Sequence, residues 1–322
     1  MASIVAVVAL CIGCATAPTH EAPGPSTNSV APNHITTNEW SAATKRNLFR
    51  LSAESFWRIE LPQGKRLDAS GLVWMNGNLL IVADGNPTLF EVELGETNTA
   101  RLKNTEVFTW PQLTPFMVGK RGRFDFEGLA RDERGRIYAC EEGNRWVFRF
   151  DPTTTNVERL EIDWAPVQKY FSSDQNASFE GIAVGGGRLW LANERERARV
   201  IEVDLPTLKV VGDFAPEPSF WALVTHYSDI CWFEGHLFLL LRHHRVILEI
   251  NPATREVLAE YNYMDMEEAP EHRYLRAYPT GTMEGLAVDK KYFWLLTDNN
   301  GFARQQDSFD RGPTLFKCKR PD

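Results

Sequence analysis

Cysteine and histidine are scarce in this chain of 322 residues, which contains five of the first and seven of the second. Cys140, Cys231 and Cys318 stand far apart in strand-like segments, so they match neither a zinc knuckle nor a Cys-x-x-Cys redox pair. We expect three buried, reduced thiols, because free cysteine packs like a small hydrophobic side chain. One disulfide among them stays open if the compartment is oxidising.

Several sequence features that mark common protein classes are also missing. No P-loop, no Rossmann glycine pattern and no Gly-x-Ser-x-Gly nucleophile elbow is present. The net charge is −8, so the chain lacks the basic excess that binding to a nucleic-acid polymer requires. Beyond the N-terminus no apolar run approaches the length of about 18 residues that a spanning helix needs. We therefore expect any membrane contact to be made only through the N-terminal segment.

The N-terminal segment resembles an export signal. Residues 2–13 are apolar, as in the hydrophobic region of a signal peptide, and Ile12, Gly13 and Cys14 resemble a bacterial lipobox. We therefore predict a signal peptide over 1–14, with lipidation at Cys14 and a periplasmic or cell-envelope location. An ordinary signal peptide cleaved just after this segment is the alternative. Residues 15–37 are rich in Pro, Ser, Thr and Ala, which predicts a disordered linker.

The rest of the chain, 38–322, is organised by an internal repeat. Five six-residue strings align, and their second residues are 57, 53, 48 and 56 positions apart. Four of the strings have Gly in third place, and all have Leu or Ile in fourth place. The strings are Ala69–Trp74 (ASGLVW), Phe126–Arg131 (FEGLAR), Phe179–Val184 (FEGIAV), Tyr227–Trp232 (YSDICW) and Met283–Val288 (MEGLAV).

Each string is followed by a turn, an apolar strand, a polar cluster and an alternating strand. An outer strand closes most repeats, and we predict it at Glu106–Trp110 in the first repeat and at Val257–Tyr261 in the fourth. Four strands in about 50 residues are typical of a blade in an all-β propeller. The last repeat lacks a fourth strand, which Ser55–Leu61 can supply, so five blades are favoured and six remain open. A two-sheet sandwich would not explain the recurring string.

The second residue of each string carries the strongest functional signal. The first strand of a blade lines the central channel, so equivalent positions gather around the axis. Three carboxylates so close together would repel each other unless some are protonated or a cation lies among them. Ligands that are all oxygens suit calcium. We therefore predict a calcium site formed by Ser70, Glu127, Glu180, Ser228 and Glu284.

The alternative interpretation of these residues is structural. In that case Glu-Gly is a turn at the start of a strand, and the carboxylates face water in the channel. The Gly after the Glu fits both interpretations, because it permits close approach of backbones at the axis.

The order Ser, Glu, Glu, Ser, Glu resembles the calcium-activated nucleotidases of the apyrase family. That resemblance implies a five-bladed propeller with calcium on its axis, and the string Ala69–Asp84 is its closest local match. The recurring Glu-Gly-Leu-Ala strings also resemble the SdiA-regulated and phytase esterase-like propellers of bacterial envelopes. The repeats cover about residues 50–320, and no long match to the nucleotidases lies outside them.

Polar residues after the second strand of each blade are expected at the same mouth of the channel. Calcium there could orient a phosphate, arginines could hold its other oxygens, and a carboxylate could orient water. The candidate general bases are Asp84 and Glu142, and Asp84 also matches a position near the nucleotidase active site. The candidate anion-binding residues are Arg123, Arg195, Arg242 and Arg276. Such charges also serve solubility at many propeller mouths.

Two functions of different classes follow. The first is a calcium-binding envelope propeller lipoprotein with an uncharacterised or non-catalytic binding role, whose partner is an envelope protein. The second is a calcium-dependent hydrolase of phosphate esters or nucleotides, whose partner is a small phosphate-bearing molecule. The sequence leaves open whether the protein is an enzyme, because a fold does not imply a function.

Overall fold

A computed structural model describes residues 46–62, 65–75, 77–117, 124–171, 173–174, 177–195, 197–219, 224–276 and 280–321. The predicted signal peptide at 1–14, its lipidation residue Cys14 and the linker at 15–37 lie outside the described residues. The candidate anion-binding residue Arg123 lies outside them as well.

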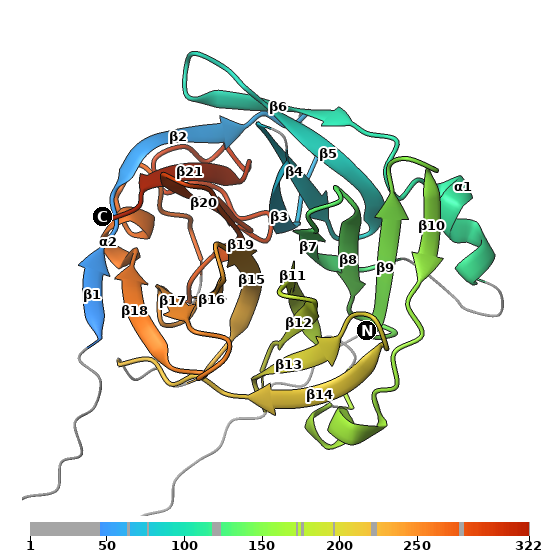
Figure 1. Cartoon of the computed structure of the whole chain (residues 1–322). Coiled ribbons are helices and arrows are strands. Elements are labelled where there is room, and N and C mark those ends of the chain that lie inside the picture. The colour runs from blue at the N-terminus through green and yellow to red at the C-terminus, as the bar shows by residue number, and fades with distance from the viewer. Residues whose placement is uncertain are drawn as a thin grey trace, which may run out of the picture. The chain divides into compact units, whose positions relative to one another are not determined.

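The described part of 38–322 is an all-β propeller, as predicted from the repeat (Figure 1). Its strands form five antiparallel sets of four, and each set corresponds to one repeat of the sequence. The first three sets are β3 (Ala69–Met75), β4 (Asn78–Ala83), β5 (Asn86–Leu94), β6 (Thr99–Asn104); β7 (Phe126–Arg131), β8 (Ile137–Glu141), β9 (Trp146–Asp151), β10 (Asn156–Arg159); and β11 (Phe179–Gly185), β12 (Arg188–Asn193), β13 (Arg199–Asp204), β14 (Lys209–Phe214). The remaining two are β15 (Tyr227–Phe233), β16 (His236–Leu241), β17 (Val246–Ile250), β18 (Val257–Asn262); and β19 (Met283–Val288), β20 (Tyr292–Thr297), β21 (Thr314–Lys319) with β2 (Ala53–Ile59).

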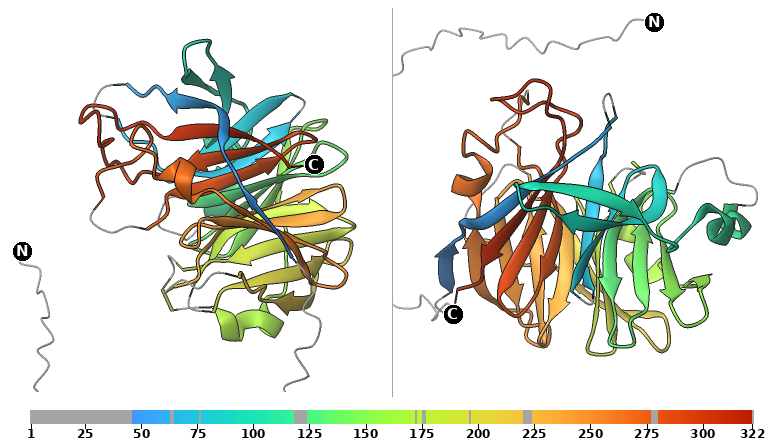
Figure 2. Two further views of the ribbon diagram at one scale, coloured as in Figure 1. Left: turned by 90° about the vertical axis from the view of Figure 1, so that its left-hand side faces the viewer. Right: turned by 90° about the horizontal axis from the view of Figure 1, so that it is seen from above.

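The five repeated strings form the innermost strands, β3, β7, β11, β15 and β19. Each of these strands contacts the next, and β19 contacts β3, so the ring is closed. Figure 2 shows the blades standing side by side around the centre. The apolar core lies between neighbouring blades in five clusters, because each sheet has two faces that must be covered.

The N-terminal segment closes the ring, as predicted. Strand β2 pairs antiparallel with β21 and thus supplies the missing outer strand of the last repeat. Its end also pairs with β6 of the first blade through Arg58 and Ile59. Before it, β1 (Asn47–Arg50) pairs parallel with β18 of the fourth blade. One continuous segment therefore joins three blades (Figure 2).

The outer strand of the fourth repeat is confirmed as β18, but the prediction for the first repeat is wrong. The outer strand there is β6 (Thr99–Asn104), and residues 106–110 lead into a short helix. Of the apolar residues that favoured a strand, Phe108 is buried in a loop, whereas Trp110 is exposed at the start of the helix. Phe108 is fully buried against Phe126 and Phe150 at a φ of 55°, which no strand residue adopts.

Helices are few and short in the described part of the chain. They are α1 (Trp110–Leu113), α2 (Met264–Glu267) and the 3-10 turns η1 (Thr114–Met117) and η2 (Ala165–Tyr170). Among the described residues, none of the helices has both the length and the apolar character needed to cross a bilayer.

Candidate cation site at the axial mouth

The second residue of every repeated string sits on a β-bulge. In each pair of inner strands the register shifts across this position, between Ala69 and Leu72 in the first blade and between Phe126 and Gly128 in the second. The same shift occurs in the other three blades. A bulge leaves its residue out of the ladder and re-aims the side chain. The structure therefore gives Ser70, Glu127, Glu180, Ser228 and Glu284 equivalent positions at one end of the inner strands.

Glycine in third place lets the inner strands meet at the axis. A Cβ added to Gly128 would lie 2.7 Å from the Cα of Gly181 in the next blade. A Cβ on Gly181 would lie 2.6 Å from the backbone nitrogen of Ile230 in the blade after that. The fourth blade has Asp229 at this place, and its side chain is fully buried. The axis below the bulges is thus filled by backbone and one carboxyl group.

The residue that follows each second strand returns to the same end of the blade. These residues are Asp84, Glu142, Glu194, Arg242 and Asp298. In four blades the backbone N–H of this residue donates to the carbonyl oxygen two places before the bulged residue, at 2.7–2.9 Å. Asp84 donates in this way to Asp68, and Glu142 donates to Asp125. The antiparallel pairing therefore places three residues of each blade at one mouth. They are the bulged residue, the residue two places before it and the residue that follows the second strand.

Two residues of this mouth were missed as candidate ligands. Asp125 lies two places before Glu127, and Glu194 follows β12 as Glu142 follows β8. A signal was present for both, because their equivalents in other repeats are also polar. Asp125 corresponds to Asp68, Ser178, His226 and Thr282. Sequence reasoning followed the second place of the string and the residues after the second strand, and it thus overlooked the residue two places before the bulge.

Asp84, Asp125 and Glu127 form the first acidic group. One oxygen of each lies within 4.8 Å of the others, and the Ser70 hydroxyl donates to Asp84 at 2.8 Å. Burial raises the pKa of Asp84 to about 6, and the Asp125 carboxylate adds to that rise. Burial also raises the pKa of Glu127 well above its usual value, with further increases from Asp84 and Asp125. The first and second blades therefore hold carboxylates that resist ionisation together.

Glu142, Glu180 and Glu194 form the second acidic group, which is equally close-set. Burial raises the pKa of Glu142 to about 8 even though the Ser178 N–H donates to it. Burial, then the Glu127 and Glu194 charges, raise the pKa of Glu180 well above its usual value. Burial also acts on Glu194, but His226 and the nearby arginines outweigh it and lower the pKa. We call these two groups together the acidic mouth.

Arg242 makes the mouth asymmetric. It takes the place after β16 where the four other blades carry a carboxylate, and it pairs with Glu284 of the fifth blade and with Glu194 of the third at 2.9 Å. Glu284, a residue of the predicted calcium site, is already neutralised by this ion pair. The unbalanced negative charge therefore gathers over the first three blades, around Glu127 and Glu180.

The predicted anion-binding arginines are engaged by carboxylates. Arg195 pairs with Glu194 and with Asp174, the latter at 3.2 Å. Arg276 lies farther out, in a network with Glu267 and Glu268. The predicted general bases Asp84 and Glu142 do lie in the acidic mouth, one in each group. The mouth is thus better supplied with cation ligands than with free anion-binding groups.

The chemistry of these donors fits a hard cation. The groups consist of carboxylate and hydroxyl oxygens, which calcium prefers to nitrogen or sulfur ligands. Two further observations indicate that oxygen atoms at this mouth lack a binding partner. The Ser228 hydroxyl and one oxygen of Glu284 are buried without a hydrogen-bond partner among the described residues. Buried polar atoms are almost always satisfied in native proteins, so these two call for a further partner.

Comparisons with known proteins agree with this fold. The family model described as "Phytase-like: Esterase-like activity of phytase" matches residues 67–301. The structure is similar to glutaminyl cyclase from Myxococcus xanthus, with a TM-score of 0.55 and 15% identity over 85% of this chain and 97% of that chain. It also matches PQQ-bound aldose sugar dehydrogenase from Streptomyces coelicolor, with a TM-score of 0.44 and 12% identity over 84% and 99% of the two chains. No curated protein matches the sequence. At 15% identity, the likeness to glutaminyl cyclase extends to the β-propeller fold alone.

Proposed function

This chain belongs to the phytase-like family, and we propose that it is a calcium-binding β-propeller whose ion lies in the acidic mouth. The observation that carries the proposal is the pair of close-set carboxylate groups, Asp84–Asp125–Glu127 and Glu142–Glu180–Glu194. Six carboxylates in a largely buried region are costly unless positive charge compensates them. Arg195 and Arg242 supply only part of that charge, and both contact Glu194.

The proposed ligands combine the sequence prediction with the structure. Glu127 lies with Asp84 and Asp125 in the first acidic group, where the Ser70 hydroxyl donates to Asp84, and Glu180 lies in the second group. Ser228 and Glu284 lie on the side of Arg242 and complete the ring of bulged residues. A calcium ion takes six to eight oxygens, and it needs water in addition to these side chains.

Calcium binding should be visible as a gain in thermal stability. A ligand that binds only the native state stabilises it by about 2.7 kcal/mol at a hundred times its Kd. For a domain of this size that corresponds to a rise in Tm of about 5–10 °C. The measurement is thermal unfolding of the purified protein in EGTA, in calcium and in magnesium. A calcium-specific rise is expected, and equal Tm values in all three conditions would overturn the proposal.

Phosphoester hydrolysis is the second candidate function, and membership of the phytase-like family favours it. Bound calcium would supply Lewis-acid polarisation of a phosphate oxygen. Asp84 is the best candidate to orient the attacking water, because it is the most exposed of the six carboxylates and its pKa is about 6. A base whose pKa lies near the working pH is the most effective. Arg195 and Arg242 are already paired with carboxylates, which counts against their binding a phosphate and thus against this candidate function.

The hydrolase is tested by phosphate release from p-nitrophenyl phosphate and from ATP. If it is correct, release requires calcium and stops in EGTA, and Asp84→Asn lowers kcat by about 10²-fold or more. Asp265→Asn, at an exposed site on α2, serves as the control and should leave the rate unchanged. Absence of release in a protein that calcium still stabilises would remove the hydrolase and leave the calcium-binding propeller.

We also propose that the protein works in the bacterial cell envelope, tethered through Cys14 and the linker 15–37. The sequence of the N-terminal segment supports this proposal. Labelling of the expressed protein with a lipid precursor, with Cys14→Ala as the comparison, would test it.

A further inference from the structure

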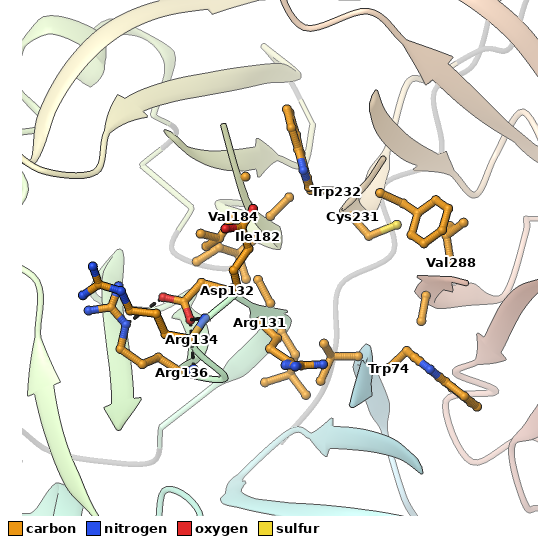
Figure 3. Close-up of a pocket in the computed structure, with 18 of the residues that line it drawn as sticks. Trp74, Arg131, Asp132, Arg134, Arg136, Ile182, Val184, Cys231, Trp232 and Val288 are labelled. Atoms are coloured by element: carbon orange, nitrogen blue, oxygen red, sulfur yellow. Dashed lines mark hydrogen bonds and ion pairs between the residues drawn. The ribbon is translucent and has the colours of Figure 1, made fainter. Parts of the chain in front are cut away.

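The opposite end of the axis holds a large cavity that the acidic mouth does not use. Its volume is about 1390 Å³, and it is lined by the last residues of the five inner strands and by the turns that follow them. We call it the basic funnel (Figure 3). The sixth place of every repeated string contributes to its wall, with Trp74, Arg131, Val184, Trp232 and Val288.

The basic funnel and the acidic mouth are separate compartments. The second and sixth places of a string are four residue steps apart, which corresponds to about 13 Å along a strand. The layer between them contains the fourth-place residues, which are at most 1% exposed, and the buried Asp229. A ligand can therefore occupy the funnel without contacting the proposed calcium ligands.

The charge of the funnel is positive, opposite to that of the mouth. Its wall contains five acidic residues. Asp132, Glu158 and Glu161 are paired with Arg136, Arg149 and Arg159, whereas Glu133 forms no ion pair with a described residue. Asp289 is also engaged, because it accepts from the indole N–H of Trp294 at 2.7 Å. By contrast, no described carboxylate forms an ion pair with any of four cations of the wall, which are Arg131, Arg134, Lys290 and Lys291.

Arg131 is the most informative of these cations. It stands in sixth place on β7, and its Nε is buried without a partner among the described residues. In Figure 3 its side chain extends along the funnel wall toward Trp74 of the neighbouring blade. A buried guanidinium nitrogen without an acceptor is costly, and an anion in the funnel would supply that acceptor.

Two tryptophans give the funnel rigid, flat, apolar walls. Trp232 lies directly against Gly185, where an added Cβ would be 2.1 Å from the ring. Trp74 stacks on Trp294 with ring centroids 5.2 Å apart. Because both rings are held by packing, a ligand does not have to order them, which favours binding. Ligand pockets typically combine such apolar walls with a few well-placed polar groups.

We propose that the basic funnel is a second ligand site, which takes a small organic anion with a flat apolar ring. The anionic group binds Arg131, and the ring lies against Trp74 and Trp232. Arg134, Lys290 and Lys291 attract the anion to the opening. This proposal does not depend on calcium binding, because none of these residues belongs to the acidic mouth.

The probe is 8-anilinonaphthalene-1-sulfonate, a flat aromatic anion whose fluorescence rises in an apolar site. We expect saturable binding of one probe per folded protein, with the same Kd in EGTA and in calcium. Arg131→Met should weaken binding at least tenfold, whereas Arg50→Met, at an exposed site on β1, should not change it. Neutral N-phenyl-1-naphthylamine should bind wild type and Arg131→Met equally.

A second variant tests the proposal in case Arg131→Met does not fold. Lys290 and Lys291 are exposed, so the double variant Lys290→Glu/Lys291→Glu should fold normally and weaken probe binding more at low salt than at high salt. Unchanged circular dichroism is required of each variant. The proposal is overturned if the folded protein shows no saturable binding, or if Arg131→Met and the double variant both bind the probe as the wild type does.

Discussion

Replacing Glu127 with Gln is expected to stabilise the calcium-free protein and to abolish its stabilisation by calcium. Glu127 is 8% exposed, and its group includes Asp84 and Asp125 within 4.8 Å. Without a cation, an ionised Glu127 suffers both desolvation and repulsion from these neighbours. The amide has nearly the same shape and carries no charge, so the apo protein loses this penalty. With calcium present, the same change removes a ligand.

The two effects have opposite signs, which makes the experiment decisive. Thermal unfolding of Glu127→Gln should give a higher Tm than the wild type in EGTA, by several degrees, and little or no rise on adding calcium. Glu96→Gln, in the exposed loop between β5 and β6, is the matched control and should behave as the wild type in both conditions. A full calcium response in Glu127→Gln would refute its role as a ligand. A lower Tm in EGTA would show that Glu127 is a structural residue.

Replacing Asp229 with Ala is expected to destabilise the propeller by about 3–6 kcal/mol, because three buried N–H groups each lose an acceptor. The Asp229 carboxyl accepts from the N–H of Ile230 at 2.8 Å and of Leu286 at 2.7 Å. It also accepts from the backbone of Leu72. These donors belong to three different blades. Burial raises the pKa of Asp229 well above its usual value, and the three N–H groups reduce that rise.

Chemical denaturation of two variants separates this role from simple space filling. Asp229→Asn keeps the shape and one carbonyl oxygen, so it should lose less stability than Asp229→Ala. Asp229→Gly restores the residue that the other four strings have in third place, yet it should be at least as unstable as Asp229→Ala. If Asp229→Gly is as stable as the wild type, glycine alone suffices at the axis and the three hydrogen bonds contribute nothing net.

The fold was largely predictable because the same six-residue string recurs five times and is followed each time by the same pattern of turns and strands. The alternation of turns and apolar strands predicts four-stranded units, and the lack of a fourth strand after Lys319 predicts closure by an N-terminal strand. That strand is β2. The error at 106–110 has a local cause. Val107, Phe108 and Trp110 have the composition of a strand, but Phe108 is buried in a loop against the rings of Phe126 and Phe150, and Trp110 is exposed at the start of α1.

The candidate site was predictable only in part. The recurring second place identified the five bulged residues, because equivalent positions in a ring of repeats must meet at the axis. Asp84 and Glu142 were identified as well, because an antiparallel second strand returns to the same end. Asp125 was missed although its equivalents in the other repeats are polar, because it lies before the recurring string that marked the axis.

The sequence by itself determined the order and spacing of the five repeated strings, the residues that surround the axis and the acidic character of one end. These properties follow from periodicity, which is a property of the chain alone. Only the tertiary structure decided which charges compensate one another. Arg242 lies 42 residues from Glu284 and 48 from Glu194, yet it pairs with both. It likewise decided that Arg131 and two tryptophans from separate repeats share one cavity. Such contacts depend on where side chains from different blades point, and no local pattern encodes that.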